Sequence, residues 1–565
     1  MRFWLLLPAL TGMLMVQAQV TPFSYQIQKQ VTAQRGAVVS AHPLASQAGV
    51  WVLKQGGNAF DAAIATQLAL AVVYPGAGNL GGGGFLLAVQ PGGNTVALDY
   101  REVAPAAAHR DMYLDSNGNP QTNLSQFGHK AAGVPGTVSG LFAAHRYARL
   151  PFRTLISPAI ELAQNGFIIT AAEARNLNQA MGTFIQHSTR NSAFIRYGGW
   201  KAGDTLVQPE LAATLRRIRE KGAKGFYEGT TAQLLVAEMS RGGGLITLQD
   251  LKNYRTAERK AMSSSYRGHT IIGMPLVSSG GILLQQMLGM IEPYPIGSWG
   301  FQSPQAVQLM VEAARRAFAD RAEFLGDADF VKVPVAQLTH ASYLQQRMAD
   351  FVPGKAGSSA TTGHGKPLAE SEETTHLSVV DADGNAVAVT TTLNGNYGCR
   401  TVVGGAGFLL NNEMDDFSIK PGVPNMYGAL GTEANAIAPG KRMLSSMTPT
   451  IVLKDGAPLL VLGTPGGTTI PMQVFQVVVN LVDFQLPLTD AVWKPRFHHQ
   501  WKPDLVMLER TIPDALRTAL RAMGYETMDR DAIGRFEAIR ITVKNNQRQV
   551  EAVGDQRGDD SAAGY

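Results

Sequence analysis

The sequence is short of cysteine, of charge and of long apolar runs, and each shortage excludes a class of protein. A single cysteine, Cys399, rules out an intrachain disulfide and any metal site built on several cysteines. Charged residues make up only 16% of the chain. The small excess of basic over acidic residues, 49 against 44, forms no basic run, which argues against a dedicated nucleic-acid binder. No stretch beyond the N-terminal segment is apolar for long enough to predict a membrane-spanning helix.

The 565 residues do contain enough apolar material, 45%, for a large packed core. This length allows three or four domains or one large two-lobed unit. Glycine is frequent, at 60 residues, so tight turns and close backbone contacts are expected.

The N-terminal segment is predicted to be a signal peptide. Arg2 precedes an apolar run, Phe3 to Val16, which is too short to span a bilayer and leads into the small-residue pattern Val16-Gln17-Ala18. Cleavage after Ala18 would release a periplasmic or secreted protein without a membrane attachment. A retained membrane anchor is the alternative.

Helical and extended patterns alternate up to about Pro353. An apolar helix is predicted from Ala59 to Val73 behind the cap Asn58. An amphipathic helix is predicted from Pro304 to Phe324, and its expected polar face holds Arg315, Arg316, Arg321 and Glu323. Residues 353–373, without hydrophobic periodicity, are predicted to form a flexible surface linker.

A β-hairpin follows this linker, with strands at 374–380 and 386–393 around a turn centred on Asp383. With a five-residue turn, residues whose numbers sum to 766 face each other, so Thr374 lies opposite Thr392. Asn394 then follows on the same face. A two-residue Asp-Gly turn would shift this register by one. The other face takes the apolar side chains Leu377, Val379, Val387, Val389 and Leu393.

Thr374 is a candidate nucleophile because it stands where the linker meets a polar strand face. A threonine hydroxyl is weak unless a base is near, and chain cleavage in front of Thr374 would supply one as a free α-amine with a pKa near 8. A purely structural strand threonine is the alternative interpretation of the pattern.

Other polar groups have both a functional and a structural interpretation. The turn Gly463-Thr464-Pro465-Gly466-Gly467 precedes a helix and could stabilise an oxyanion or be only a tight turn. Arg101 could clamp a carboxylate or form a surface pair with Glu102 or Asp99. Glu413 and Asp416 could hold an ammonium group or belong to a polar loop.

Three further features are interpreted as structural. His498 and His499 are adjacent, so on a strand they point to opposite sides and do not readily share a metal ion. Cys399 has no evident His or Asn context and is not expected to be a nucleophile. The run Gly81 to Gly84 lacks the spacing of a dinucleotide-binding fingerprint and is expected to allow close packing.

The segment Glu373-Thr374-Thr375-His376-Leu377-Ser378 resembles γ-glutamyltranspeptidase, also called glutathione hydrolase, a family of N-terminal nucleophile hydrolases. The resemblance extends in order from about Gly36 to the C-terminus. It includes the motifs beginning at Gly57, Gly78, Asp99, Gly133, Tyr266, Leu409, Leu444 and Pro495, and the closing Ala563-Gly564-Tyr565. It implies an α+β fold, a four-layer αββα sandwich built from two chains after self-cleavage.

The resemblance also implies how the precursor matures. The signal peptide would be residues 1–18, the large subunit 19–373 and the small subunit 374–565, with the cleavage site between Glu373 and Thr374. Thr374 would then be both the nucleophile and, through its new amine, the general base.

Site residues are likewise implied by the resemblance. Thr392 would position the Thr374 hydroxyl, and Gly466 and Gly467 would form the oxyanion hole. Three residues would hold the substrate α-carboxylate: Arg101, Ser445 and Ser446. Three would hold the α-ammonium group: Asn394, Glu413 and Asp416. Tyr427, in Asn425-Met426-Tyr427-Gly428, would close the pocket. The segment Gly395 to Cys399 departs from the family pattern and leaves the preferred acceptor open.

These observations predict a γ-glutamyl hydrolase and transferase that acts on glutathione and related compounds. It would need no cofactor or metal and have no nucleic-acid partner. Two alternatives stay open: a glutaryl-cephalosporin-type acylase on the same fold, and a non-enzymatic periplasmic glutathione-binding protein. Glu413 and Asp416 favour a substrate with an α-ammonium group, because a glutaryl chain would leave both carboxylates unpaired.

Overall fold

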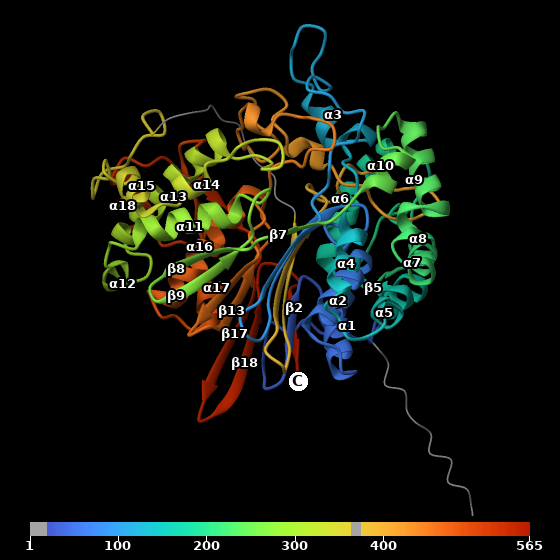
Figure 1. Cartoon of the computed structure of the whole chain (residues 1–565), viewed down its shortest axis with the longest axis horizontal. Helices are drawn as coiled ribbons and strands as arrows, with labels where there is room; N and C mark the ends of the chain where they lie inside the picture. Colours follow the sequence, from blue (N-terminus) through green and yellow to red (C-terminus); the bar gives the residue numbers. More distant parts are fainter. Residues whose placement is uncertain (1–19, 363–373) are drawn as a thin grey trace, which may run out of the picture.

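The computed structural model describes residues 20–362 and 374–565, which form four layers in the order helices, sheet, sheet, helices (Figure 1). The predicted αββα sandwich is therefore confirmed. The predicted signal peptide, residues 1–18, and Glu373 lie outside the described residues.

The first large sheet is antiparallel throughout and contains the predicted hairpin. Its strands lie in the order β19 (Ser561–Gly564), β2 (Ala37–Ser40), β10 (Thr375–Val380), β11 (Ala386–Thr392), β3 (Gly83–Val89), β4 (Thr95–Asp99) and β7 (Ala257–Arg259). Strands from both sides of the expected cleavage site alternate here, so hydrogen bonds of one sheet would join the two chains.

The second large sheet is also antiparallel and packs against the first. Its strands lie in the order β1 (Gln30–Ala33), β18 (Gln547–Gly554), β17 (Glu537–Lys544), β13 (Ala457–Gly463), β12 (Thr450–Lys454), β9 (His269–Gly273) and β8 (Met262–Tyr266). Two smaller sheets consist of β14 (Phe497–His498), β15 (Val506–Glu509) and β16 (Thr527–Arg530), and of β5 (Phe167–Ile168) with β6 (Thr205–Leu206).

One helical layer covers the first sheet, on the right in Figure 1. Its centre is α2, which begins and ends at the predicted residues, Ala59–Val73, and is buried along its whole length. The Asn58 side chain accepts from the backbone N–H groups of Phe60 and Asp61, and this cap fixes where the helix begins. The layer contains α1 (Pro43–Lys54), α4 (Thr137–His145), α5 (Phe152–Asn165), α6 (Ala171–His187), α7 (Pro209–Lys221), α8 (Lys224–Tyr227), α9 (Gly229–Gly242) and α10 (Leu248–Asn253).

The other helical layer covers the second sheet, on the left in Figure 1. Its main helices are α11 (Gly280–Ile291), α13 (Pro304–Phe324) and α16 (Ile470–Val482), and all three contribute to the second core. Shorter helices complete it: α12 (Ile296–Trp299), α14 (Val335–Leu338), α15 (Ala341–Arg347), α17 (Leu488–Trp493) and α18 (Asp514–Ala522). One more short helix, α3 (Thr122–Gln126), lies at the top of Figure 1.

The hairpin has the predicted register. Thr375 pairs with Thr391 and Leu377 with Val389, so paired numbers sum to 766 as a five-residue turn requires. The predicted apolar side chains face the first helical layer, while Val380, Ala386 and Ala388 face the second sheet. Both faces of the hairpin are therefore buried, which removes any freedom for the register to slip.

The glycines 81–84 allow close packing, as predicted. A Cβ atom on Gly82 would lie 2.1 Å from the carbonyl oxygen of Thr392, and one on Gly81 would lie 2.1 Å from that of Leu409. Any side chain here would push apart the strand that carries Thr392.

The predicted polar face of α13 is not a solvent-facing surface. Arg315, Arg316 and Arg321 are buried. Arg316 pairs with Glu312 at 2.6 Å, and Arg315 also reaches Asp504. Helical periodicity marks the side on which charges gather, but it does not show that other segments cover that side and supply counter-charges.

The predicted surface linker is only partly a free surface. The N–H group of Gly357 donates to Glu312 at 3.0 Å. Ser359 is buried, and its hydroxyl donates to the carbonyl oxygen of Trp501. The segment up to Thr362 is therefore anchored, and residues 363–373 lie outside the described residues.

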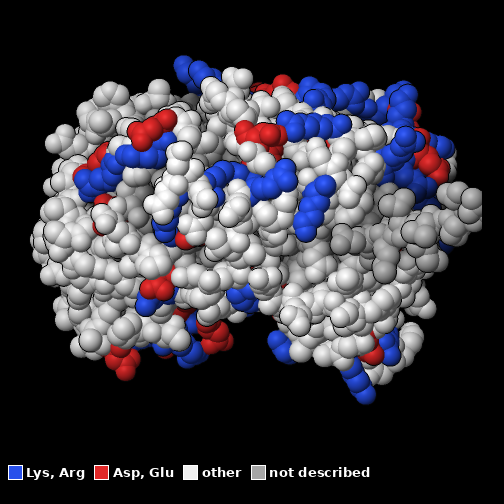
Figure 2. Space-filling view, turned by 90° about the horizontal axis from the view of Figure 1, so that it is seen from below, with Lys and Arg blue, Asp and Glu red and all other residues white. Residues whose placement is uncertain are grey.

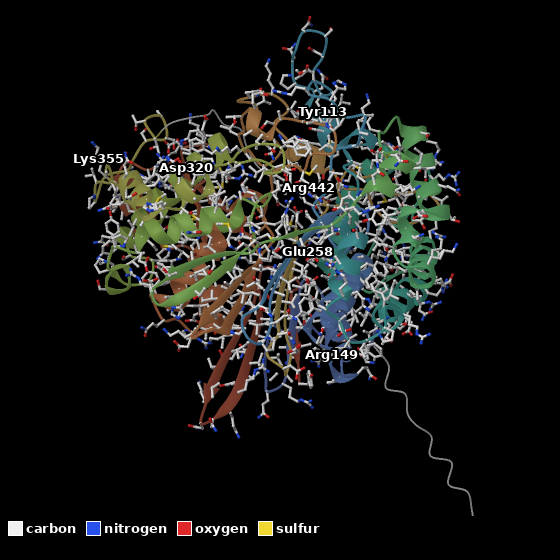
Figure 3. All side chains as sticks on the ribbon, viewed as in Figure 1. Tyr113, Arg149, Glu258, Asp320, Lys355 and Arg442 are labelled. Atoms are coloured by element: carbon white, nitrogen blue, oxygen red, sulfur yellow. The ribbon has the colours of Figure 1, made fainter. Side chains whose placement is uncertain are left out.

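The surface reflects the low content of charge. Viewed from below, most of the surface is uncharged, and many of the acidic side chains lie beside basic ones (Figure 2). Arg149, labelled at the lower end of Figure 3, pairs at 2.6 Å with Asp383 in the β10–β11 turn. The turn therefore lies at the bottom of the molecule, and the other end of the hairpin carries Thr374 and Thr392.

No helix within residues 20–362 and 374–565 is long and apolar enough to cross a membrane.

Candidate active site

Thr374 directly precedes β10 and is almost completely buried. Continuing the register by one residue from the pair Thr375–Thr391 places Thr374 opposite Thr392. The N–H group of Asn394 donates to the Thr392 hydroxyl at 2.7 Å, which orders the end of β11. The strand pairing thus brings together the two threonines that the sequence singled out.

Thr374 lines a pocket at this end of the hairpin. Most of the predicted site residues line this pocket: Arg101, Thr374, Thr392, Asn394, Asp416, Tyr427, Ser445, Ser446 and Gly467. Glu413 and Gly466 stand directly behind the lining, Glu413 in contact with Arg101 and Gly466 next to Gly467. Residues from seven separate segments therefore converge on this pocket.

Arg101 is buried, so its interpretation as a surface pair is wrong. Its guanidinium group contacts Glu413 at 2.5 Å, Asp416 and, more distantly, Glu102 at 3.7 Å. Burial works against the charge of Arg101, but Glu413, Asp416 and Glu102 outweigh it and raise its pKa. The arginine is a fixed positive charge in the pocket.

Three carboxyl groups, Glu102, Glu413 and Asp416, surround Arg101, and the charge of Arg321 also acts on Asp416. Burial raises the pKa of Glu413 well above its ordinary value and also raises the pKa of Asp416, although Arg101 pulls both down. Burial likewise raises the pKa of Glu102 to about 8. A cluster with this many acidic groups gains from a further cation, so an ammonium group would be stabilised here.

Arg321 is a pocket residue that sequence reasoning missed. It comes from α13, and its guanidinium group donates to the hydroxyls of Ser446 at 3.1 Å and Ser279 at 3.2 Å. Burial lowers its pKa to about 10, which keeps it charged near neutral pH. Because Ser446 accepts from Arg321, its own hydroxyl proton can point to an anion in the pocket.

The remaining missed residues lie beside predicted ones: Asn425, Met447, Thr468 and Ile470. Three of them continue the motifs around Tyr427, Ser446 and Gly467, and extending those motifs would have found them. Arg321 had no such local signal, because only the packing of α13 against Ser446 brings it to the pocket.

The loop at Asn425–Gly428 covers the pocket. The Tyr427 hydroxyl donates to the carbonyl oxygen of Asn394 at 2.5 Å, and its ring packs against Gly467, where a Cβ atom would lie 2.7 Å away. The Asn425 amide donates to Asp416 at 2.9 Å. These contacts join the cover to both the glycine turn and the charged side of the pocket.

The glycine turn lies between β13 and α16. Gly466 and Gly467 have φ angles of 137° and 53°, which side chains rarely permit, so this turn requires glycine at both positions. Gly467 begins the 3₁₀ turn that leads into α16, and its backbone lines the pocket. Backbone N–H groups at such a point can bind developing negative charge.

The adjacent histidines do not form a shared site. His498 contacts Gln500 at 2.9 Å and His499 contacts Asp504 at 3.4 Å, and both side chains are buried. Within residues 20–362 and 374–565, no group of three or more His, Cys, Asp or Glu side chains could hold a metal ion. Cys399 is buried, and burial raises the pKa of its thiol to about 11, so it is a poor nucleophile.

The four-layer fold places the chain in the class of N-terminal nucleophile hydrolases. Within that class the chain belongs to the γ-glutamyltranspeptidase family, whose sequence model, described as Gamma-glutamyltranspeptidase, matches residues 45–565.

Proteins with related sequences share most of the chain. It is 46% identical over 554 residues to the glutathione hydrolase proenzyme of Escherichia coli, covering 96% of this chain and 95% of that protein. It is 48% identical over 534 residues to the glutathione hydrolase proenzyme of Pseudomonas aeruginosa, covering 93% and 94%. An acylase ACY 1 proenzyme of a Pseudomonas strain is 38% identical, covering 88% of each chain.

Solved structures share the fold. A cephalosporin acylase from Bacillus halodurans superimposes with a TM-score of 0.82 at 25% identity, covering 98% of this chain and 99% of that one. A chain of the Helicobacter pylori γ-glutamyltranspeptidase matches with a TM-score of 0.55 at 40% identity, covering 59% of this chain and 94% of its own.

Proposed function

We propose that the protein is a γ-glutamyl hydrolase and transferase that acts on glutathione and other γ-glutamyl compounds through Thr374. The observation that carries this is the position of Thr374 in one pocket with Arg101, Asp416 and Ser446. A nucleophile beside groups for both an α-carboxylate and an α-ammonium suits a γ-glutamyl donor. Relatives named glutathione hydrolase, at 46% and 48% identity, support the same activity.

Maturation would convert one chain into two. Cleavage between Glu373 and Thr374 leaves a large chain, 19–373, and a small chain, 374–565, after removal of a signal peptide at 1–18. Pairing of β10 with β2 and of β11 with β3 supports a stable pair of chains, because these sheet bonds cross between them. The predicted signal peptide supports a periplasmic or secreted location.

In the mature protein the α-amine of Thr374, when neutral, accepts the proton of the Thr374 hydroxyl. The hydroxyl oxygen attacks the γ-carbonyl carbon, and the N–H groups of Gly466 and Gly467 would stabilise the oxyanion. The C–N bond then breaks, the departing amine takes the proton, and a γ-glutamyl ester remains on Thr374. Water, or the amine of an acceptor, attacks this ester and regenerates the hydroxyl.

Recognition of the donor would divide the pocket by charge. Arg101, Ser445 and Ser446 would bind the α-carboxylate, and Asn394, Glu413 and Asp416 the α-ammonium group. Since Arg101 already contacts Glu413 and Asp416, an amino-acid head group would extend an existing network of alternating charge. Tyr427 would close over the bound donor.

The test is the fate of the purified chain on a denaturing gel. With 60.5 kDa spread over 565 residues, the two pieces should be about 38 and 21 kDa. The small piece should begin at Thr374 by N-terminal sequencing and should carry a γ-glutamyl affinity label. A single intact chain that binds glutathione without turnover would instead support the binding-protein alternative.

The acylase alternative has one observation in its favour, the match of the whole chain to a cephalosporin acylase. Its relatives are less similar in sequence, at 38% against 46% and 48%. Turnover of γ-glutamyl and glutaryl anilides distinguishes the two. Faster turnover of the glutaryl compound would contradict the assigned ammonium site.

A further inference from the structure

Gln473 is a fully buried amide on a helix that is otherwise largely apolar. It lies in the second turn of α16, between Met472 and Val474, and has no exposed surface. A buried amide destabilises a protein unless its donors and acceptor are bonded. The hydrogen-bond partners of Gln473 therefore indicate its role, and all of them lie in or beside the glycine turn.

The Gln473 amide bonds to three residues at the end of β13 and the start of α16. Its oxygen accepts from the Thr464 hydroxyl at 2.9 Å. Its nitrogen donates to the Thr469 hydroxyl at 2.6 Å and to the carbonyl oxygen of Pro465 at 3.3 Å. Because a carbonyl oxygen can only accept, the Pro465 contact fixes which end of the amide is the nitrogen.

These bonds turn two carbonyl groups toward α16. The Pro465 carbonyl accepts from the Gln473 amide at 3.3 Å and lies 2.8 Å from the Thr464 hydroxyl. The Gly466 carbonyl accepts from the Thr469 hydroxyl at 2.7 Å and from the Thr469 backbone N–H at 2.9 Å. In a trans peptide the N–H points opposite to the C=O. Holding both carbonyls toward α16 therefore directs the N–H groups of Gly466 and Gly467 away from it. Gly467 faces the pocket, whereas Gln473 does not line it.

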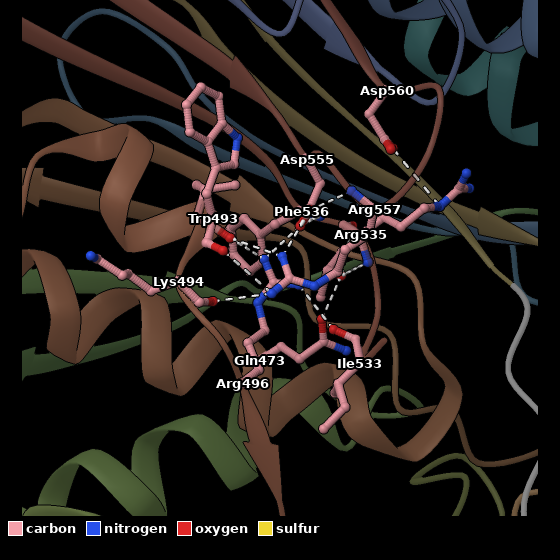
Figure 4. Close-up of polar contacts among 12 residues, drawn as sticks. Gln473, Trp493, Lys494, Arg496, Ile533, Arg535, Phe536, Asp555, Arg557 and Asp560 are labelled. Carbon is pink, nitrogen blue, oxygen red and sulfur yellow. Dashed lines mark hydrogen bonds and ion pairs between the residues drawn. The ribbon is translucent and has the colours of Figure 1, made fainter. Parts of the chain in front are cut away.

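Gln473 also fills the space between the glycine turn and the turn at Gly534, and Figure 4 shows it beside Ile533 and Arg535. A Cβ atom on Gly466 would lie 2.6 Å from the amide nitrogen, and one on Gly534 would lie 2.0 Å from the amide oxygen. The single proton of the Thr464 hydroxyl is shared among three acceptors, the Gln473 oxygen at 2.9 Å, the Pro465 carbonyl at 2.8 Å and the Arg535 carbonyl at 2.7 Å. The turn at Gly534 therefore joins the same network. The amide therefore has little room to move.

We propose that Gln473 is a positioning residue that sets the orientation of the two glycine N–H groups toward the oxyanion that forms on the substrate γ-carbonyl when Thr374 attacks. This inference rests on the proposed function, because it requires Gly466 and Gly467 to receive that oxyanion. Gln473 lies outside the pocket, yet it sets the geometry on which stabilisation of the transition state depends. Losing it should lower kcat and leave binding of the donor nearly unchanged.

The experiment replaces Gln473 by a side chain of similar length without hydrogen-bonding groups, Gln473→Met. Gln476→Met is the matched control. Gln476 is buried on the same helix, but its amide bonds to Phe497 and to the Met472 carbonyl rather than to the glycine turn. Both variants are assayed as mature enzyme, with active sites counted by a γ-glutamyl affinity label, on a γ-glutamyl anilide.

We expect Gln473→Met to lower kcat per labelled site about 10- to 100-fold, less than removal of a whole oxyanion donor, with KM within about threefold. Gln476→Met should keep kcat within about threefold. Equal kcat values for both variants, or a rise in KM alone for Gln473→Met, would overturn the proposal. If wild-type protein shows no turnover, the proposed function fails instead, and the two failures are distinguishable.

A second variant covers the case in which Gln473→Met does not mature. Thr469→Val keeps the shape of the side chain but removes the hydroxyl that links the amide to the Gly466 carbonyl. It should lower kcat per labelled site about 3- to 10-fold, again without a matching change in KM. Unchanged kcat in Thr469→Val would also overturn the proposal.

Discussion

The two walls of the pocket are built in different ways. The nucleophile wall, formed by Thr374, Thr392, Gly466 and Gly467, comes from a hairpin and one turn and is held by strand pairing and backbone geometry. The charged wall, formed by Arg101, Arg321, Glu413, Asp416 and Ser446, comes from loops and a helix far apart in the chain. It is held by buried ion pairs such as Arg101–Glu413 at 2.5 Å.

This difference matches the function proposed for each wall. A nucleophile and its oxyanion donors act only within a narrow range of distance, and a sheet that is buried on both faces holds them there. A wall that recognises an amino-acid head group must instead accept new charges. Its three carboxyl groups, Glu102, Glu413 and Asp416, outnumber the guanidinium groups of Arg101 and Arg321, so the proposed substrate ammonium would add a cation where acidic groups are in excess.

Substitution of Thr374 is expected to cause the largest loss of activity in the nucleophile wall. Thr374→Ala should give a protein that stays as one chain and has no activity, because the one hydroxyl that would both cleave the chain and attack the substrate is removed. Thr374→Ser should mature slowly or incompletely, since the hydroxyl remains but the methyl group that restricts its rotamer is lost. A denaturing gel over time measures both.

The control for this variant is Thr375→Ala, the next residue along the strand, whose side chain lies on the opposite face of β10. It should still split into two chains. Maturation of Thr374→Ala to two chains would show that the cleavage site is placed wrongly.

The second expected loss in the nucleophile wall comes from Thr392→Val. This substitution keeps the shape and removes the hydroxyl, so the mature enzyme should lose about 10- to 1,000-fold in kcat, or about 1.4 to 4 kcal/mol, if a bond that positions Thr374 is lost. Thr390→Val is the control, because its hydroxyl contacts His376 at 2.9 Å and not the pocket. Full turnover of Thr392→Val per labelled site would show that the hairpin register does not matter to catalysis.

The same difference explains why the sequence predicted the nucleophile wall better than the charged wall. Alternation along residues 374–393 and the length of one turn sufficed for the register, because a strand's partner was its neighbour in the chain. Asn58 and the apolar run behind it likewise predicted α2 to the residue. These are local signals, and strand pairing or helix capping converts them directly into structure.

The charged wall had no such local signal. Arg101 alone is equally compatible with a surface pair, and only the family motifs indicated its pocket role. Periodicity predicts only that Arg321 lies on the polar face of its helix, because it cannot show that Ser279 and Ser446 pack over that face. Buried ion pairs between distant segments depend on tertiary contacts, and no short pattern encodes both partners.

A smaller effect, confined to binding, is expected in the charged wall from Arg101→Lys. Lysine keeps the charge but loses the planar fork that contacts Glu413 and Asp416 together, so KM for a γ-glutamyl anilide should rise about 10- to 100-fold. Asp416→Asn should also raise KM by weakening the ammonium contact. Maturation to two chains should be intact in both.

Arg442→Lys controls for loss of a buried guanidinium. Arg442, labelled in Figure 3, lies near Asp99 and does not line the pocket. Its KM should stay close to the wild-type value. If Arg101→Lys and Asp416→Asn kept a normal KM, the assigned pocket would be wrong.

The smallest effect concerns a buried acid behind the nucleophile wall. Glu537 pairs with Gly463 at the start of the glycine turn, and its backbone carbonyl accepts from Ser378 on β10. Burial, with the nearby Asp560 adding to it, raises the pKa of its carboxyl group well above the ordinary value, and burial also raises that of Asp560. The nucleophile wall is therefore backed by a buried carboxyl group, Glu537, that holds its proton more tightly in the folded protein than in the unfolded chain.

This arrangement predicts that stability falls as pH rises above about 4.3. Below the ordinary pKa of about 4.3, the folded and unfolded states both hold the Glu537 proton, and its full contribution to stability is present. As pH rises, the unfolded chain releases that proton while the folded protein retains it, so the free energy of unfolding falls until the folded pKa is passed.

Glu537→Gln removes this titration and should flatten the decline in melting temperature between pH 5 and pH 9. Glu551→Gln, on the neighbouring strand in a half-buried pair with Arg540, should leave the decline unchanged. Melting curves of the three mature proteins at each pH measure the difference, and parallel declines in all three would show that the Glu537 proton does not contribute.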